Sequence, residues 1–199
     1  MRRATAADRD AVVRALVRAF DDDPLTNFLL RRGARRLDAF ATVFDVFFRR
    51  LSLPANEAWI APAGDGASGA ALWIPPGEWK TWRTWPDLAR LAAAVGLARL
   101  PRTLAATRRA ERAHPRAPPH WYLFAIGVDP AHQGRGVGTA LLRAVLATCD
   151  ARGDPAYLEA SRPDNARLYA RHGFAARPDV QVAPGGPSFT PMWRAARAP

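Results

Sequence analysis

The segment from Trp121 to Gly138, WYLFAIGVDPAHQGRGVG, constrains the fold of this 199-residue chain more than any other. Its first half is rich in aromatic and β-branched residues and stops at Asp129-Pro130, which predicts a strand. A glycine-rich loop follows, and apolar residues then recur at helical spacing, which predicts a helix beginning near Gly136. The first N–H groups of a helix have no partner within it, and the helix dipole favours negative charge there. The sequence therefore predicts a site for a phosphate group.

Two common nucleotide-binding patterns fit this loop less well. A P-loop requires lysine and then serine or threonine after its last glycine, but here Thr139 follows Gly138 directly. A dinucleotide site requires the spacing G-x-G-x-x-G soon after the strand, whereas Gly134, Gly136 and Gly138 are spaced G-x-G-x-G. Glu159, at the end of the next strand, stands at about the distance of a ribose-binding acid, so a dinucleotide site stays as the minor alternative.

A third pattern fits better. Residues 133–138, QGRGVG, resemble the Q/R-x-x-G-x-G/A pyrophosphate loop of the GCN5-related N-acetyltransferase (GNAT) superfamily. Residues 164–174, DNARLYARHGF, resemble its closing segment N-x-x-x-x-Y-x-x-x-G-F, and residues 156–160 stand where the superfamily has its fifth strand. Within the superfamily, the strings IGVDPAHQGRGVGTALL and YLEASRPDNARLYARHGF and the ending PMWR are most similar to the puromycin N-acetyltransferase branch.

The resemblance implies an α/β fold with a mixed, mostly antiparallel central sheet flanked by helices, as one acetyltransferase domain over residues 1–199. The stretch of about 77–118 is longer than the usual connection, so we expect a helical insertion on the acceptor side. It also implies acetyl-coenzyme A as co-substrate, no metal, and direct transfer of acetyl from the thioester to the amine of a small molecule. The implied donor-binding residues are Ile126, Val128, Gln133, Gly134, Arg135, Gly136, Val137, Gly138, Thr139, Asn165 and Tyr169.

The candidate catalytic residues are Tyr169, which the resemblance implies, and Glu159, which is selected for its place late in the predicted strand. Asn165 and Tyr169 are four apart in a predicted short helix and share one face, where the matching family tyrosine is the general acid. An ordinary tyrosine would give its proton to a thiolate uphill by about 2 kcal/mol, so a hydrogen bond to sulfur is an alternative role, and a core aromatic is the structural alternative. Glu159 is the first candidate base, although an arginine could instead hold it as a structural carboxylate. His120 and His132 are second candidates, and a water chain is a further one.

Local patterns predict the remaining elements. Helices are expected over residues 8–20 and 36–51, and a hairpin over residues 58–61 and 70–74. The acidic triplet Asp21–Asp23 is predicted to be a solvated loop, with contact to a cationic substrate as the alternative. In the insertion, proline positions predict two helices. Three tryptophans precede the first of them and either pack in the core or wall an apolar acceptor pocket: Trp79, Trp82 and Trp85.

Composition narrows the remaining function classes. The formal net charge of +11 is spread along the chain without a helix-turn-helix or zinc pattern, so we expect a solvated basic surface that helps to attract coenzyme A rather than a nucleic-acid site. No apolar run reaches the roughly 20 residues of a membrane span, so we expect a cytoplasmic protein, as monomer or homodimer. The single cysteine, Cys149, is expected in the core. Besides the enzyme, the sequence is compatible with a non-catalytic sensor of acyl-coenzyme A and, less well, with a nucleic-acid-binding protein.

Overall fold

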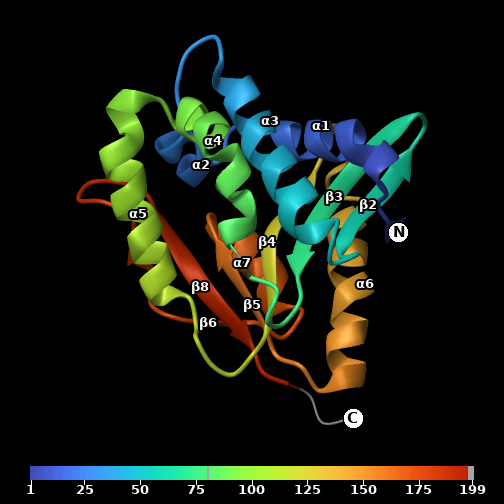
Figure 1. The fold of residues 1–199 in the computed structure, drawn as a ribbon. Coiled ribbons are helices and arrows are strands. Elements are labelled where there is room, and N and C mark those ends of the chain that lie inside the picture. Colours follow the sequence, from blue (N-terminus) through green and yellow to red (C-terminus); the bar gives the residue numbers. More distant parts are fainter. Residues whose placement is uncertain (80, 197–199) are drawn as a thin grey trace.

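A central sheet organises the protein in the computed structural model, which describes residues 1–79 and 81–196 without the side chains of residues 81 and 82 (Figure 1). The strand order is β1-β2-β3-β4-β5-β8-β6, and β7 also pairs with β8. All neighbouring strands are antiparallel except β4 and β5. The strands are β1 (Arg2–Arg3), β2 (Ala58–Ala63), β3 (Gly66–Ile74), β4 (Trp121–Val128), β5 (Ala156–Ala160), β6 (Ala175–Ala176), β7 (Val180–Gln181) and β8 (Ser188–Arg194).

Helices cover both faces of this sheet. Apolar residues of α1 and α3 pack with β2 and β3, whereas those of α6 and α7 join a second core cluster with β4 and β5. The expected mixed, mostly antiparallel sheet flanked by helices is confirmed. The helices are α1 (Arg9–Ala19), α2 (Pro24–Leu29), α3 (Arg36–Phe47), α4 (Leu88–Val95), α5 (Leu100–Ala113), α6 (Val137–Arg152) and α7 (Pro163–Ala170).

The parallel pair β4–β5 comes apart part-way along its length. The two strands pair from Trp121/Ala156 to Leu123/Leu158, yet β4 continues to Val128. Phe124 is an extra residue in β4, because Trp73 faces Leu123 and Leu72 faces Ala125. Such a β-bulge bends a strand and increases its twist. The pairing with β5 ends just before the bulge, so the sheet opens into a wedge between β4 and β5.

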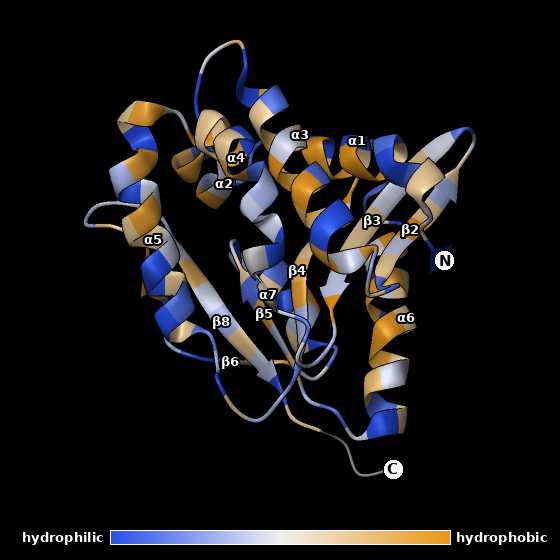
Figure 2. Ribbon diagram, in the orientation of Figure 1, coloured by the Kyte–Doolittle hydropathy of each residue, from blue (hydrophilic) through white to orange (hydrophobic). Residues whose placement is uncertain are grey.

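The predicted helical insertion is confirmed as α4 and α5, each of which packs on a different part of the molecule. Helix α4 packs on α3 (Figure 1), and α5 packs on α2 and reaches β7. The Arg109 side chain donates to the carbonyl of Val182, just after β7, at 2.8 Å. Figure 2 shows hydrophobic and hydrophilic residues alternating along α5, as expected for a helix with one buried side. The insertion therefore spans the two parts of the sheet that the wedge separates.

Two local expectations need correction. The hairpin turn is tighter than predicted, because β3 begins at Gly66 and Ala63 already faces it. The segment after α1 is not a simple loop, since Pro24 opens the short helix α2. Asp23 is its N-cap and accepts a hydrogen bond from the Thr26 N–H at 2.7 Å. The aspartate that was expected to be solvated is thus part of a helix start.

Candidate active site

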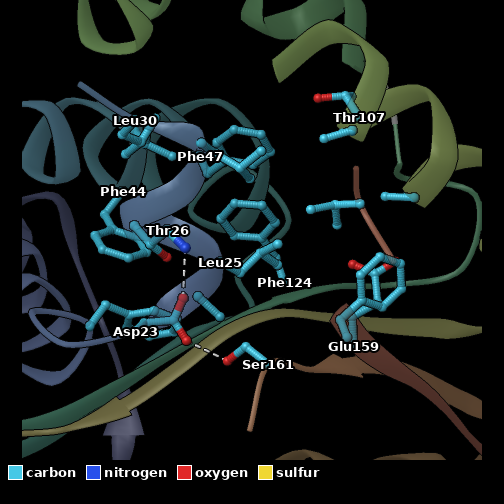
Figure 3. Close-up of a pocket in the computed structure, with 18 of the residues that line it drawn as sticks. Asp23, Leu25, Thr26, Leu30, Phe44, Phe47, Thr107, Phe124, Glu159 and Ser161 are labelled. Atoms are coloured by element: carbon cyan, nitrogen blue, oxygen red, sulfur yellow. Dashed lines mark hydrogen bonds between the residues drawn. The ribbon is translucent and has the colours of Figure 1, made fainter. Parts of the chain in front are cut away.

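A cavity of about 560 Å³ lies against the wedge and is lined by residues of the sheet and of α2, α3, α4, α5 and α7. Most of its wall is apolar, with the Phe124 ring stacked on Phe47 at 3.9 Å between centroids (Figure 3). The described cavity-lining residues include three carboxylates, Asp23, Glu111 and Glu159, but neither lysine nor arginine. On a chain with a net charge of +11, this is a locally acidic, apolar pocket.

The edge of β4 that faces the wedge has free backbone donors. Just after the end of β4, the Asp129 N–H donates to the carbonyl of Ser68 in β3 at 2.9 Å. Because hydrogen bonding alternates along an antiparallel pair, Gly127 and Ala125 also bond to β3, and the N–H groups of Ile126 and Val128 point to the opposite edge. The pairing of β5 has already ended there. These two amides can therefore donate to a ligand that enters the wedge.

The glycine loop after β4 is held in place by three contacts. The buried Asp129 carboxylate accepts from the Ala131 N–H at 3.0 Å and pairs with Arg18 at 3.0 Å. The Gln133 side chain donates to the Val128 carbonyl at 3.1 Å, which ties the loop back to the strand. Loop and strand edge therefore form one rigid unit.

The loop ends on an exposed helix start. Gly134 and Gly136 have φ values of +74° and +78°, a conformation that favours glycine, and nothing lies within 4 Å of a Cβ built on either. Helix α6 starts at Val137, and its first bond from the helix start runs from the Ala140 N–H to the Gly136 carbonyl at 3.0 Å. The N–H groups of Val137, Gly138 and Thr139 consequently have no intrahelical acceptor. With Arg135 exposed beside them, these N–H groups can donate hydrogen bonds to an anion.

Helix α7 directs two predicted residues at the same cavity. Asn165 and Tyr169 both line it, as their spacing of four residues predicts. Tyr169 is buried, and its ring packs against Phe174. Burial raises the pKa of the Tyr169 hydroxyl, and the negative charge of Asp23 raises it further. The hydroxyl is thus a weaker acid than an ordinary tyrosine, which favours hydrogen-bond donation over complete proton transfer.

Glu159 also lines the cavity, but its partners differ from those considered from the sequence. Tyr122 and Tyr157 donate hydrogen bonds to its two carboxylate oxygens, each at 3.1 Å. Within the described chain, no arginine or lysine pairs with Glu159, so the structural alternative of a carboxylate fixed by arginine is wrong. Burial raises the pKa of the Glu159 carboxyl to about 7, although the two tyrosines act in the opposite direction. A carboxylate with this pKa is suited to general base catalysis near neutral pH.

The histidine in the cavity wall is not one of the candidates selected from the sequence. Among the described lining residues the histidine is His114, which stacks on Trp79 at 5.9 Å, whereas His120 and His132 lie elsewhere. The His120 Nδ1 bonds to the Pro118 carbonyl at 2.9 Å, so in its neutral form His120 Nε2 accepts from the His114 Nε2–H at 3.1 Å. Burial lowers the pKa of His114 to about 4, so it places no positive charge next to Glu159 at neutral pH.

The acidic triplet splits into two kinds of residue. Asp21 and Asp22 are exposed and pair with Arg36 and Arg162, respectively. Asp23 is only 4% exposed, lines the cavity and has no arginine or lysine partner within the described chain. It accepts hydrogen bonds from the Thr26 N–H and the Ser161 hydroxyl (Figure 3). For Asp23, the prediction of a solvated loop is wrong.

The tryptophans of the insertion were predicted either to pack in the core or to wall the pocket. Trp79 and Trp85 line the cavity, which agrees with the pocket-wall alternative, and Trp85 remains 66% exposed at its surface. The Trp82 side chain lies outside the described residues.

Cys149 is buried as expected. Over residues 1–79 and 81–196, no cluster of three potential metal ligands occurs, and no helix there has the length and apolar character to cross a bilayer.

Comparison with known proteins shows which family this chain belongs to. The model of the acetyltransferase (GNAT) family matches residues 39–174, which include the wedge, the glycine loop and α7. The chain belongs to the GNAT acetyltransferase family. The predicted enzyme class, an N-acetyltransferase, is thereby confirmed, and acetyl-coenzyme A is the general acetyl donor of GNAT enzymes.

Three relatives of this GNAT chain illustrate its range. An uncharacterized N-acetyltransferase of Schizosaccharomyces pombe is 27% identical over 197 residues, covering 91% of this chain and 76% of the relative. The N-alpha-acetyltransferase RimI of Mycobacterium tuberculosis is 48% identical over 62 residues, 30% of this chain and 38% of RimI. A crystal structure described as histone acetyltransferase HPA2 and related acetyltransferase, from Corynebacterium glutamicum, is 28% identical, with a TM-score of 0.77 over 99% of this chain and 96% of that one.

A more distant structure shows how widely the fold is shared. The polyamine N-acetyltransferase of Drosophila melanogaster has a TM-score of 0.70 at 17% identity, covering 98% of each chain. Such relatives differ in acceptor, so the acceptor of this GNAT enzyme has to be inferred from its own cavity.

Proposed function

We propose that this protein is an acetyl-coenzyme A-dependent N-acetyltransferase that moves the acetyl group directly from the thioester to the amine of a small molecule. The observation that carries the proposal is the apolar cavity of about 560 Å³ that Glu159 and Tyr169 both line. Cavities of this size suit drug-sized ligands rather than an extended protein chain. Helices α4 and α5 narrow the site further, which favours a compact acceptor over a polypeptide.

The donor is assigned to the wedge and the glycine loop. The amides of residues 136–139 would hold its pyrophosphate, with Gln133, Gly134 and Arg135 as the adjoining loop residues. The free amides of Ile126 and Val128 would meet the pantetheine arm and the thioester carbonyl. Preorganised amides at a developing oxyanion are worth roughly 3 kcal/mol each. Asn165, which lines the cavity, would contact the same arm.

The transfer then needs one group that accepts the proton of the amine and one that stabilises the departing sulfur, and the cavity offers a residue for each. The amine nitrogen bonds to the carbonyl carbon, and the carbon–sulfur bond breaks. Glu159 accepts the proton that the amine loses, while Tyr169 donates a hydrogen bond to the departing sulfur. Because the pKa of Glu159 is about 7, this carboxylate is ionised and ready to act as a base just above neutral pH.

Two finer assignments concern the domain organisation and the branch of the family. We propose that residues 1–199 form one acetyltransferase domain, because the core clusters share strands of a single sheet. The similarity of the strings around the glycine loop and α7 also supports a place near the puromycin N-acetyltransferase branch. Puromycin is therefore a reasonable member of any acceptor panel.

The test is thiol release from acetyl-coenzyme A with a panel of small amines that includes puromycin, aminoglycosides and arylalkylamines. We expect release that depends on the added amine, together with a stable N-acetylated product in the mass spectrum. A peptide panel with free N-termini serves as the comparison and should react more slowly. Tight donor binding without thiol release for any amine would overturn the proposal in favour of a non-catalytic acyl-coenzyme A sensor.

A further inference from the structure

The cavity holds a buried negative charge that the acetyl-transfer reaction does not use. Asp23 is 4% exposed and lines the cavity from the start of α2. Burying an ionised carboxylate is costly unless it is paired and hydrogen-bonded. Asp23 has two hydrogen-bond donors, Thr26 and Ser161, but within the described chain it has no cationic partner. A ligand that brings a positive charge would complete this site.

The two neighbouring aspartates both have arginine partners, so within the triplet Asp23 alone lacks a cationic partner in the described chain. Asp21 pairs with Arg36, and Asp22 pairs with Arg162 at 3.0 Å. The carboxylates of both neighbours are therefore compensated within the protein, although their side chains are 55% and 78% exposed, respectively. The aspartate with the greatest need for a counter-charge is the one that lacks it and faces the cavity.

The position of Asp23 distinguishes it from the proposed base. Figure 3 shows Asp23 and Glu159 at separate places around the cavity. Asp23 nevertheless lies close enough to the reacting region for its charge to raise the pKa of Tyr169. The cavity thus offers two separate negative positions in a mostly apolar lining, with no described lysine or arginine in it.

We propose that Asp23 binds a second positively charged group of the acceptor, so that the substrate is an amine with a second basic nitrogen separated from the first by an apolar spacer. This inference rests on the proposed acetyl transfer. The nitrogen near Glu159 is acetylated, and the other nitrogen stays protonated against Asp23. Glu111, which is exposed on α5 and also lines the cavity, adds to the negative potential that draws a dication in.

The probes are two amines of nearly the same shape, 4-(aminomethyl)benzylamine and 4-methylbenzylamine. They share the reacting aminomethyl group and differ in whether the far end is charged. For the wild type we expect a KM for the diamine that is lower by on the order of 10- to 100-fold, because hydrogen bonds to charged groups are worth this much. This exceeds the twofold advantage of having two reactive amines.

The decisive variant is Asp23→Asn. Asparagine caps a helix as well as aspartate does, so α2 should be retained, and an unchanged melting temperature checks this. The KM for the diamine should rise to that of the monoamine, while the KM values for the monoamine and for acetyl-coenzyme A stay within about twofold. Asp22→Asn, in the same triplet but exposed and paired with Arg162, should change none of them. Calorimetric titration of both amines, with coenzyme A present, should give the same order of affinity without turnover.

The following results would count against the proposal. An equal loss for both amines in Asp23→Asn would assign Asp23 to the structure or to the reacting amine. A diamine preference that survives in Asp23→Asn, or no preference in the wild type, would exclude a second cation site at Asp23. Turnover of the monoamine tests the acetyl-transfer proposal separately, and its absence with every amine would overturn both.

Discussion

Removing the Tyr157 hydroxyl should change the pH at which the enzyme becomes active. Tyr157 is fully buried, and its hydroxyl donates to one oxygen of Glu159 at 3.1 Å. This bond stabilises the ionised carboxylate and opposes the burial that raises the pKa of Glu159 to about 7. A hydrogen bond to a charged group is worth about 1.5–3 kcal/mol, and one pKa unit corresponds to about 1.4 kcal/mol. Tyr157→Phe should therefore raise the pKa of Glu159 by about 1–2 units.

The assay is the pH profile of kcat with a saturating amine, since kcat reports ionisations in the enzyme–substrate complex. The base must be ionised, so kcat falls as the pH drops through the pKa of Glu159. We expect the acidic limb to move from about 7 in the wild type to roughly 8–9 in Tyr157→Phe. At pH 7 this corresponds to a loss of roughly 5- to 50-fold that disappears well above pH 9.

Two features make this experiment specific. Tyr122→Phe removes the matching bond to the other oxygen, also 3.1 Å long, and should give a shift of similar size. Burial lowers the pKa values of His114 and His120, so neither histidine produces a limb in this range. An acidic limb that stays in place, or a loss of kcat that is equal at all pH values, would refute the assignment of Glu159 as a base tuned by tyrosines.

Three further predictions follow from the same site. Because the pKa of Glu159 is raised from 4.5 to about 7 on folding, ionisation of Glu159 destabilises the folded state as the pH rises through this range. Glu159→Gln should therefore increase the free energy of unfolding at pH 8 by about 1–3 kcal/mol relative to wild type, and by almost nothing at pH 4.5. Urea unfolding at the two pH values measures this difference. Gly136→Ala should weaken calorimetric coenzyme A binding by about 10-fold, because φ is +78° there, whereas Gly138→Ala, with its nearest new contact at 3.6 Å, should have little effect. Thr107→Trp, at an exposed position that lines the cavity, should raise the amine KM and leave donor affinity intact, and Arg108→Trp on the same helix serves as the matched control.

The parts of the site that depend on local sequence could be predicted. The glycine loop and the start of α6 follow from glycines that adopt positive φ and from the apolar pattern after them. The shared face of Asn165 and Tyr169 follows from helical spacing. The alternation rule for strands would also have placed Tyr157 on the face of Glu159, because the two are separated by one residue.

The parts that depend on distant segments could not be predicted. Pro24 marks Asp23 as a possible helix N-cap, but the burial of Asp23 and the pairing of Asp22 with Arg162, just before α7, depend on distant segments. The bulge at Phe124 is not visible in a run of alternating apolar residues, yet it opens the wedge. His114 enters the site only because α5 crosses from α2 to β7. In each case the burial or the pairing comes from tertiary structure, which a pattern along the chain does not record.

The most direct test of the account measures amine-dependent thiol release from acetyl-coenzyme A by the wild type, Glu159→Gln and Tyr169→Phe, with donor affinity measured in parallel by calorimetry. General acid and base groups contribute roughly 100- to 10,000-fold, so we expect Glu159→Gln to lose at least about 100-fold in kcat and Tyr169→Phe to lose at least about 10-fold, with donor affinity unchanged. Variants that both turn over like the wild type would contradict the assignment of this cavity as the site of acetyl transfer.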